Sequence, residues 1–129
     1  MHETTIGEMA VEYNVTPRAL RFYEDRHLLQ PRREGMMRLY SRGDRLRLEA
    51  IIKAKQLAFT LSEIAELLEG TRNVSAGLEE VLRPALIMTQ IAHLEHQRSE
   101  IDDAISRLRA IQLRREIAAA QERDMGLDN

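Results

Sequence analysis

The positions of the hydrophobic residues predict several short helices in the first half of the chain and one long helix in the second. In the segment 6–13 apolar residues recur at helical spacing, and Thr5 and Glu8 form a capping box in front of them. Each of these side chains can satisfy an N–H group that the end of a helix leaves free. A first helix is therefore expected from about Ile6 to Tyr13.

A second helix is expected to begin a few residues later. Thr16 is a favourable N-cap and Pro17 suits the first helical position, which predicts a helix from Pro17 to about Asp25. Two short helices joined by so tight a turn form the helix-turn-helix pattern, which ordinary αα corners share. Arg18 and Arg21 lie one turn apart on the same face of this helix. A sharply capped helix with two arginines near its start is typical of helices that enter a DNA groove.

The next segment predicts a β-hairpin, or wing, with basic residues on both arms. Pro31 stands at its entrance, and Gly35 separates two short runs within 28–41.

Two further helices follow. Ser41 and Asp44 form a box-like start for a helix over roughly 43–56.

The fourth helix is expected to begin at another capping box. Thr60 and Glu63 supply that box, the apolar residues Ile64 and Leu68 follow it, and Gly70 stands at the C-cap position.

From residue 84 onward the pattern is that of one long helix with an apolar stripe. Pro84 is tolerated in the first turn of such a helix, and a short turn over 78–83 is expected before it. The apolar positions alternate by four and three residues, with Arg98 and Gln112 as polar interruptions, which is a heptad repeat. A helix from Pro84 to Ala119 is about 54 Å long, and nothing else in the chain can cover its stripe, so we expect it to pair with a second copy. The residues expected at this dimer seam are Ile87, Ile91, Leu94, Ile101, Ile105 and Leu108.

These elements predict a mainly α fold, in which a winged helix-turn-helix domain with a small β-hairpin wing precedes a long C-terminal coiled-coil dimerisation helix. The expected divisions are a DNA-binding domain over 1–70, a polar linker over 71–83, the dimerisation helix over 84–122 and a short tail over 123–129.

Charge is distributed unevenly along the chain. The net charge is −2, but residues 1–60 carry eleven basic and eight acidic residues, a net +3, and residues 61–129 carry eight and thirteen, a net −5. The excess of positive charge assigns phosphate contact to the N-terminal half.

Composition excludes several other classes of protein. There is no cysteine, which excludes thiolate metal sites and disulfides, and no apolar run approaches the length of a bilayer span. The N-terminus lacks the regions of a signal peptide, so a soluble cytoplasmic protein without a membrane partner is expected. No glycine-rich phosphate loop, nucleophile elbow or zinc-protease helix is present, so we expect neither catalytic residues nor a cofactor.

His93 and His96 lie three residues apart on the long helix and could be ligands of a metal ion. Only Glu100, Asp102 or Asp103 could join them as ligands. Exposed histidines beside the dimer seam are the simpler interpretation, and no metal site is predicted.

Three motifs in order resemble the MerR family of bacterial transcription regulators. They are Arg-Ala-Leu-Arg-Phe-Tyr-Glu at 18–24, Arg-Leu-Tyr-Ser at 38–41 and Leu-Ala-Phe-Thr-Leu-Ser-Glu-Ile at 57–64, and the resemblance runs from about Thr5 to Leu68. The metal- and redox-sensing members use cysteines near the C-terminal end, which are missing here. The small-molecule effector is therefore left unassigned.

The resemblance implies roles for individual residues. Arg18 and Arg21 would lie in the major groove, and Tyr23 would lie at the phosphate backbone. Arg38 and Tyr40 would be wing contacts, with Arg38 gripping a phosphate. The full set of expected DNA-binding residues is Thr16, Arg18, Arg21, Tyr23, Arg38, Tyr40 and Lys55, where Lys55 supports a second wing-like loop at 57–60.

Other side chains near this surface are not expected to be specific DNA contacts. Leu20 and Phe22 are expected in the core. Six further arginines suit either phosphate contact or simple solvation: Arg26, Arg32, Arg33, Arg42, Arg45 and Arg47.

The sequence therefore favours a dimeric regulator that binds double-stranded DNA at a pseudo-palindromic promoter operator. The resemblance implies that it bends and untwists a promoter spacer that is too long, and so acts on RNA polymerase indirectly. The resemblance also implies an antiparallel coiled coil between two protomers. The alternative is a coiled-coil adaptor or scaffold whose helix-turn-helix unit binds protein, and an enzyme is the least favoured reading.

Overall fold

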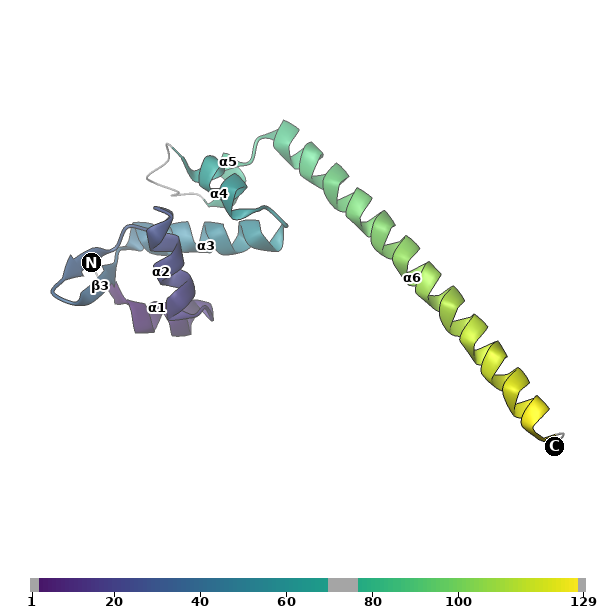
Figure 1. The fold of residues 1–129 in the computed structure, drawn as a ribbon. Helices are drawn as coiled ribbons and strands as arrows, with labels where there is room; N and C mark the ends of the chain where they lie inside the picture. Colours follow the sequence, from purple (N-terminus) through teal and green to yellow (C-terminus); the bar gives the residue numbers. More distant parts are fainter. Residues whose placement is uncertain (1–2, 70–76, 128–129) are drawn as a thin grey trace. The chain divides into compact units, whose positions relative to one another are not determined.

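The computed structural model describes residues 3–69 and 77–127 and divides the chain into two compact units, Met1–Pro84 and Ala85–Asn129 (Figure 1). In the described residues the first unit contains a three-stranded sheet and five helices, and the second consists of the long helix. The elements are β1 (Thr4–Thr5), α1 (Ile6–Tyr13), α2 (Pro17–Asp25), β2 (Arg32–Glu34), β3 (Met37–Tyr40), α3 (Arg42–Gln56), α4 (Leu61–Leu68), α5 (Leu78–Val81) and α6 (Pro84–Leu127). The predicted fold class is confirmed.

Local capping fixes the starts of α1 and α2 where the sequence predicted them. Thr5 Oγ1 accepts a hydrogen bond from the Glu8 N–H, and the Glu8 carboxylate accepts one from the Thr5 N–H. Thr16 Oγ1 accepts from the Ala19 N–H at 3.0 Å, with Pro17 at the first helical position. Between the helices Asn14 takes a left-handed conformation with φ 53°, which reverses the chain within a tight turn.

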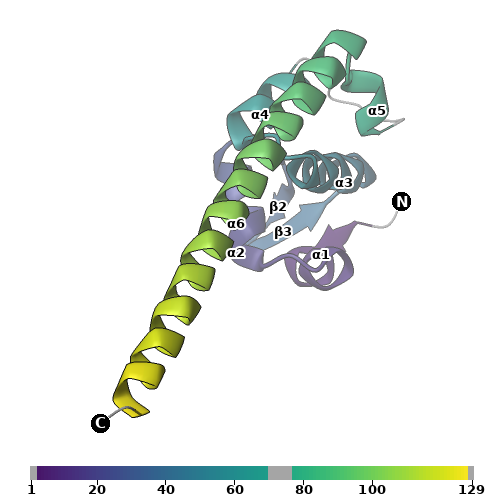
Figure 2. The same ribbon diagram turned by 90° about the vertical axis from the view of Figure 1, so that its right-hand side faces the viewer.

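The predicted wing is present as β2 and β3, joined by a turn in which Gly35 has φ +61°. The sheet also contains β1, which the sequence did not predict, because two residues are too few to show a strand periodicity. The strand order is β1-β3-β2, all antiparallel, so β3 is the central strand and contacts α1 as well (Figure 2).

Pairing with β1 places Tyr40, opposite Thr4, in the interior. Its side chain is 0% exposed, whereas the sequence placed Tyr40 among the wing contacts. This position does not support a direct contact between the Tyr40 side chain and DNA. Phe22, which was expected in the core, is instead 38% exposed on α2, and the Arg26 guanidinium lies 4.7 Å from its ring centroid. The side chains packed in the core with less than 2% exposure include Met9, Leu20, Leu29, Tyr40, Leu48, Ile51, Ile64 and Leu68.

The start of α3 ties the wing to the helices. The Asp44 carboxylate is largely buried and accepts hydrogen bonds from the Ser41 N–H and hydroxyl, both at 3.0 Å, and from the Gln30 N–H at 3.4 Å. One carboxylate therefore caps α3 and holds the chain that enters β2.

The segment after α4 covers the predicted linker over 71–83, including the short turn expected at 78–83. The C-cap of α4 is Glu69, and Gly70, the predicted C-cap, lies outside the described residues, as does 71–76. Residues 78–81 form α5, whose Leu78 is 5% exposed and which contacts α3. The described part of the expected linker therefore belongs to the first compact unit, which ends at Pro84.

Helix α6 has 44 residues, is about 66 Å long, and continues five residues beyond the predicted end at 122. The six residues of the predicted seam are between 36% and 65% exposed. Within the described residues, none of the helices combines the length and hydropathy that a membrane crossing requires.

Tyr40→Phe tests the position of this ring in the core. Its hydroxyl has no hydrogen-bond partner among the described residues, and burial raises its pKa. Removing an unsatisfied buried hydroxyl is expected to leave the free energy of unfolding unchanged or to raise it by about 1 kcal/mol, as measured by urea denaturation. A loss of stability would contradict this assignment.

Asp44→Ala is expected to destabilise the first unit by about 2 kcal/mol, because it removes an N-cap partner and leaves the Gln30 N–H without an acceptor. Asp44→Asn keeps one acceptor oxygen and should lose less. Equal losses in the two variants, measured by the same denaturation, would show that the acceptor oxygen has no role.

Candidate nucleic-acid interface

The two arginines of α2 are exposed and available for a ligand. Arg18 and Arg21 make no hydrogen bond or ion pair within the described residues 3–69 and 77–127. The cap at Thr16 fixes the helix that carries them, and free N–H groups at a helix start favour an anion nearby. This end of α2 therefore presents two guanidinium groups and a polarised helix terminus to solvent.

Tyr23 and Lys55, predicted on separate helices, are brought together. Lys55 Nζ donates a hydrogen bond to the Tyr23 hydroxyl at 3.3 Å and lies 5.9 Å from the centroid of its ring. The Tyr23 side chain is 4% exposed, so most of the ring is in the core. The hydroxyl accepts from Lys55 and keeps its own proton for a second acceptor, such as a phosphate oxygen.

On the wing, Arg38 is held by a carboxylate that the sequence analysis did not single out. Arg38 Nε donates to Glu24 Oε2 at 2.6 Å, and Arg33 Nη2 donates to Glu24 Oε1 at 2.9 Å. Burial alone would raise the pKa of the Glu24 carboxyl, but the hydrogen bonds from Arg38 and Arg33 hold that pKa below its ordinary value. The bond to Glu24 raises the pKa of Arg38 in turn.

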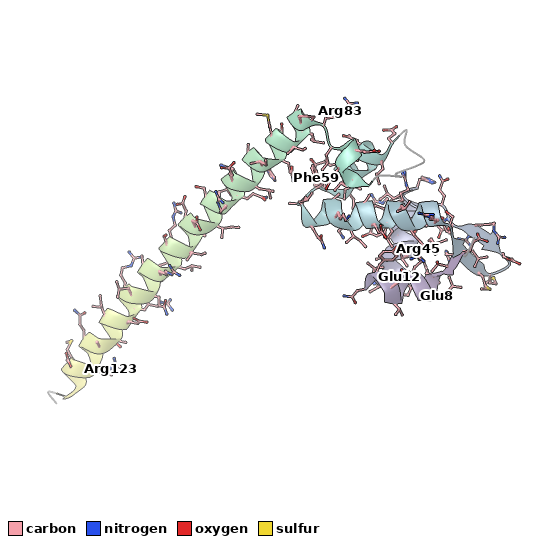
Figure 3. All side chains as sticks on the ribbon, turned by 180° about the vertical axis from the view of Figure 1, so that it is seen from behind. Glu8, Glu12, Arg45, Phe59, Arg83 and Arg123 are labelled. Atoms are coloured by element: carbon pink, nitrogen blue, oxygen red, sulfur yellow. The ribbon has the colours of Figure 1, made fainter. Side chains whose placement is uncertain are left out.

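The structure sorts the remaining arginines. Arg45, on α3, forms an ion pair with Glu12 of α1 and donates to Thr4 Oγ1 at 3.1 Å, so it joins elements within the unit (Figure 3). Arg47 Nε donates to the Leu28 carbonyl at 2.6 Å, and burial lowers the pKa of its guanidinium. These two side chains support the fold rather than the outer surface.

The other four arginines of this group lie at exposed positions: Arg26, Arg32, Arg42 and Arg33, whose bond to Glu24 is described above. Arg32 pairs with Glu3 at 2.7 Å and with Glu34 at 3.3 Å, while Arg26 covers Phe22. Arg42, at the first position of α3, is exposed. Sequence alone could not sort the six arginines, because Arg33, Arg45 and Arg47 find their acceptors on other elements of the fold.

On α6, His96 is paired with a neighbour. His96 Nε2 lies 2.6 Å from Glu100 Oε1, one turn further along the helix. Across the described part of the chain, no three histidine, aspartate or glutamate side chains gather in a way that could hold a metal ion.

Comparison with known proteins assigns this architecture to a family. Residues 4–71 match the model of the MerR HTH family regulatory protein, and residues 45–111 match a second model, described as MerR, DNA binding. The HTH-type transcriptional regulator ZntR of Escherichia coli is 45% identical over 65 residues, which are 49% of this chain and 46% of ZntR. The chain thus spans about half the length of that curated relative.

Two solved structures are similar over most of the chain. A MerR-family regulator from Bacillus cereus has a TM-score of 0.63 at 30% identity and covers 81% of this chain and 76% of its own. PbrR691 of Ralstonia metallidurans, solved in complex with lead(II), has a TM-score of 0.63 at 32% identity and covers 85% and 84%.

The relatives are transcription regulators and not enzymes, in agreement with the sequence analysis. Helix α2 with its two arginines and the wing both lie within residues 4–71, which match the family model. The chain belongs to the MerR family of helix-turn-helix transcription regulators and carries that family's DNA-binding domain.

Proposed function

We propose that this protein is a sequence-specific regulator that binds a pseudo-palindromic promoter site as a homodimer and distorts the DNA there. The observation that carries the proposal is the exposed arginine pair on the capped start of α2, which has no partner among the described residues and lies in the same unit as a wing with arginines on both strands. Arginine can bond the O6 and N7 atoms of guanine or two phosphate oxygens through its planar fork of donors.

The roles proposed for the individual residues follow from their placement. Arg18 and Arg21 read base edges in the major groove. Tyr23 and Lys55 act together on one phosphate, since the lysine orients the hydroxyl that it bonds. The Thr16 hydroxyl accepts from the helix and keeps a proton for a phosphate oxygen.

On the wing, Arg38 is proposed to contact a phosphate. Tyr40 lies in the core, and we propose no DNA contact for its side chain.

The homodimer is supported by the exposed seam on α6. A helix with a regular apolar stripe gains its stability by burying that stripe, and an identical helix supplies a matching one. The polar positions Arg98 and Gln112 in the seam set the register at some expense of stability.

Charges beside the seam favour an antiparallel pair. The heptad repeat that places Ile91 and Leu94 in the seam defines two flanks beside it. Between positions 90 and 111, one flank carries Glu95, Asp102 and Arg109, and the positions of the opposite flank hold no charged residue. Antiparallel helices bring like flanks together, so Arg109 of one copy meets the acidic residues of the other. Parallel helices would face this charged flank with the uncharged one and make no such pairs.

Two-fold symmetry then presents two copies of α2 to two half-sites, about one helical turn or a multiple of it apart. We propose that contacts of both DNA-binding domains supply the roughly 1–6 kcal/mol that bending and untwisting the DNA requires. Through this distortion the protein would act on RNA polymerase indirectly.

The first test selects bound DNA from a random or genomic pool and measures the affinity of the enriched site at several salt concentrations. We expect a two-fold symmetric site, bound with a steep dependence on salt. An adaptor that uses its helix-turn-helix unit for protein would enrich no sequence and show no salt-dependent DNA affinity.

Two variants then separate base reading from phosphate contact. Arg38→Ala is expected to weaken binding to every duplex without changing which base is preferred at each position, whereas Arg18→Ala should cost about 1–3 kcal/mol at the selected site and relax the base preference. Binding titrations on the selected and a scrambled duplex measure both. If both variants bind the two duplexes as the wild-type protein does, the proposal that α2 lies in the groove is wrong.

The antiparallel dimer is tested by charge reversal. Arg109→Glu is expected to weaken dimerisation about tenfold, because the introduced carboxylate faces acidic residues of the other copy. Adding Glu95→Arg and Asp102→Arg should restore dimerisation. Analytical ultracentrifugation measures the dissociation constant. Arg107→Glu, on the face away from the seam, is the matched control, and an equal effect there would count against the orientation.

A further inference from the structure

Glu24 joins the DNA-reading helix to both strands of the wing. It lies on the last turn of α2, and its two carboxylate oxygens accept one hydrogen bond each from Arg33 of β2 and Arg38 of β3. The Glu24 and Arg38 side chains are only 18% and 22% exposed, so this ion pair is partly shielded from water. Shielded, hydrogen-bonded ion pairs hold their geometry better than exposed ones.

The two arginines that converge on Glu24 are opposed across the hairpin. Arg33 and Arg38 are direct partners in the register of β2 and β3. Like charges directly opposite each other on neighbouring strands repel and destabilise the pair. A single carboxylate between them relieves this repulsion and fixes where the two guanidinium groups lie.

Each arginine keeps donors that Glu24 does not use. Arg38 bonds Glu24 through Nε and Arg33 through Nη2, and the other guanidinium nitrogens of both have no hydrogen-bond partner within the described residues. A guanidinium has five N–H donors, so both groups can hold the carboxylate and a phosphate at once. The arrangement therefore delivers an oriented arginine pair at a fixed place relative to α2.

We propose that Glu24 is a positioning residue for DNA recognition: it holds Arg33 and Arg38 against α2, so that the wing grips a phosphate in register with the bases that α2 reads. The inference rests on the proposed function, since it needs a preferred DNA site. Its consequence is that Glu24 lowers the affinity for any DNA through its negative charge but raises the discrimination between sites. A residue that only stabilised the fold would not separate these two effects.

The test compares Glu24→Gln with Glu34→Gln in the full chain. Glu34 also lies on the wing, but it pairs with Arg32, so the two variants remove the same charge and only one of them releases the Arg33–Arg38 pair. Affinities for the selected duplex and for a scrambled duplex are measured by fluorescence anisotropy between 50 and 200 mM salt, and the ratio of the two affinities is the discrimination.

Both variants are expected to bind scrambled DNA more tightly, with a logarithmic salt slope steeper by about 0.9, because each removes one negative charge from the wing. Discrimination should fall about fivefold or more in Glu24→Gln alone, because only there do the arginines lose their fixed position. An equal fall in both variants, or no fall in either, would overturn the inference.

A double-mutant cycle gives a second readout. Arg38→Ala should reduce discrimination clearly in the wild-type background but less than about twofold in the Glu24→Gln background, since Arg38 is no longer held there. Additive effects would overturn the inference. Glu24→Asp, which keeps the charge but shortens the side chain, replaces Glu24→Gln in the cycle if the latter does not fold.

The outcomes also separate this inference from the proposed function. A wild-type protein that shows no preferred DNA site overturns the proposed function and the inference with it. A wild-type protein that discriminates, together with a Glu24→Gln variant that discriminates equally well, overturns only the role of Glu24.

Discussion

The first unit depends on hydrogen-bonded helix starts. Helices α1, α2, α3 and α4 each begin at a threonine or serine whose hydroxyl accepts the N–H three residues later. Helices of eight or nine residues are marginal by themselves, so the caps and a small aliphatic core together decide where each one begins and points. The placement of Arg18 and Arg21 follows directly from the cap at Thr16.

Two carboxylates extend this control from the helices to the wing. Asp44 caps α3 and also accepts the Gln30 N–H at the approach to β2, while Glu24 accepts both Arg33 and Arg38. A two-stranded hairpin is marginally stable alone, so its position relative to α2 depends on such contacts and on its pairing with β1. The geometry of the whole interface is therefore set by groups that we do not assign to direct contact with the bases.

The second unit is stabilised in a different way from the first. The apolar stripe of α6 is exposed in a single chain, so the energy that orders this helix comes from another surface, which we propose to be a second copy. The same association that completes α6 would set the spacing of two DNA-binding domains. Dimerisation and recognition of a symmetric site thus become one physical event in the proposed function.

The sequence by itself determined the features that depend on neighbours within one turn. The bounds of α1 and α2, the wing arms and the long helix α6 were predicted because caps, turns and helical periodicity are local. Only the tertiary structure decided that Tyr40 is buried and Phe22 exposed, since those faces are set by the pairing of β3 with β1 and by the packing of α2. It also decided which arginines are paired, because Glu24 and Arg38 lie fourteen residues apart and meet only when the wing folds against the helix.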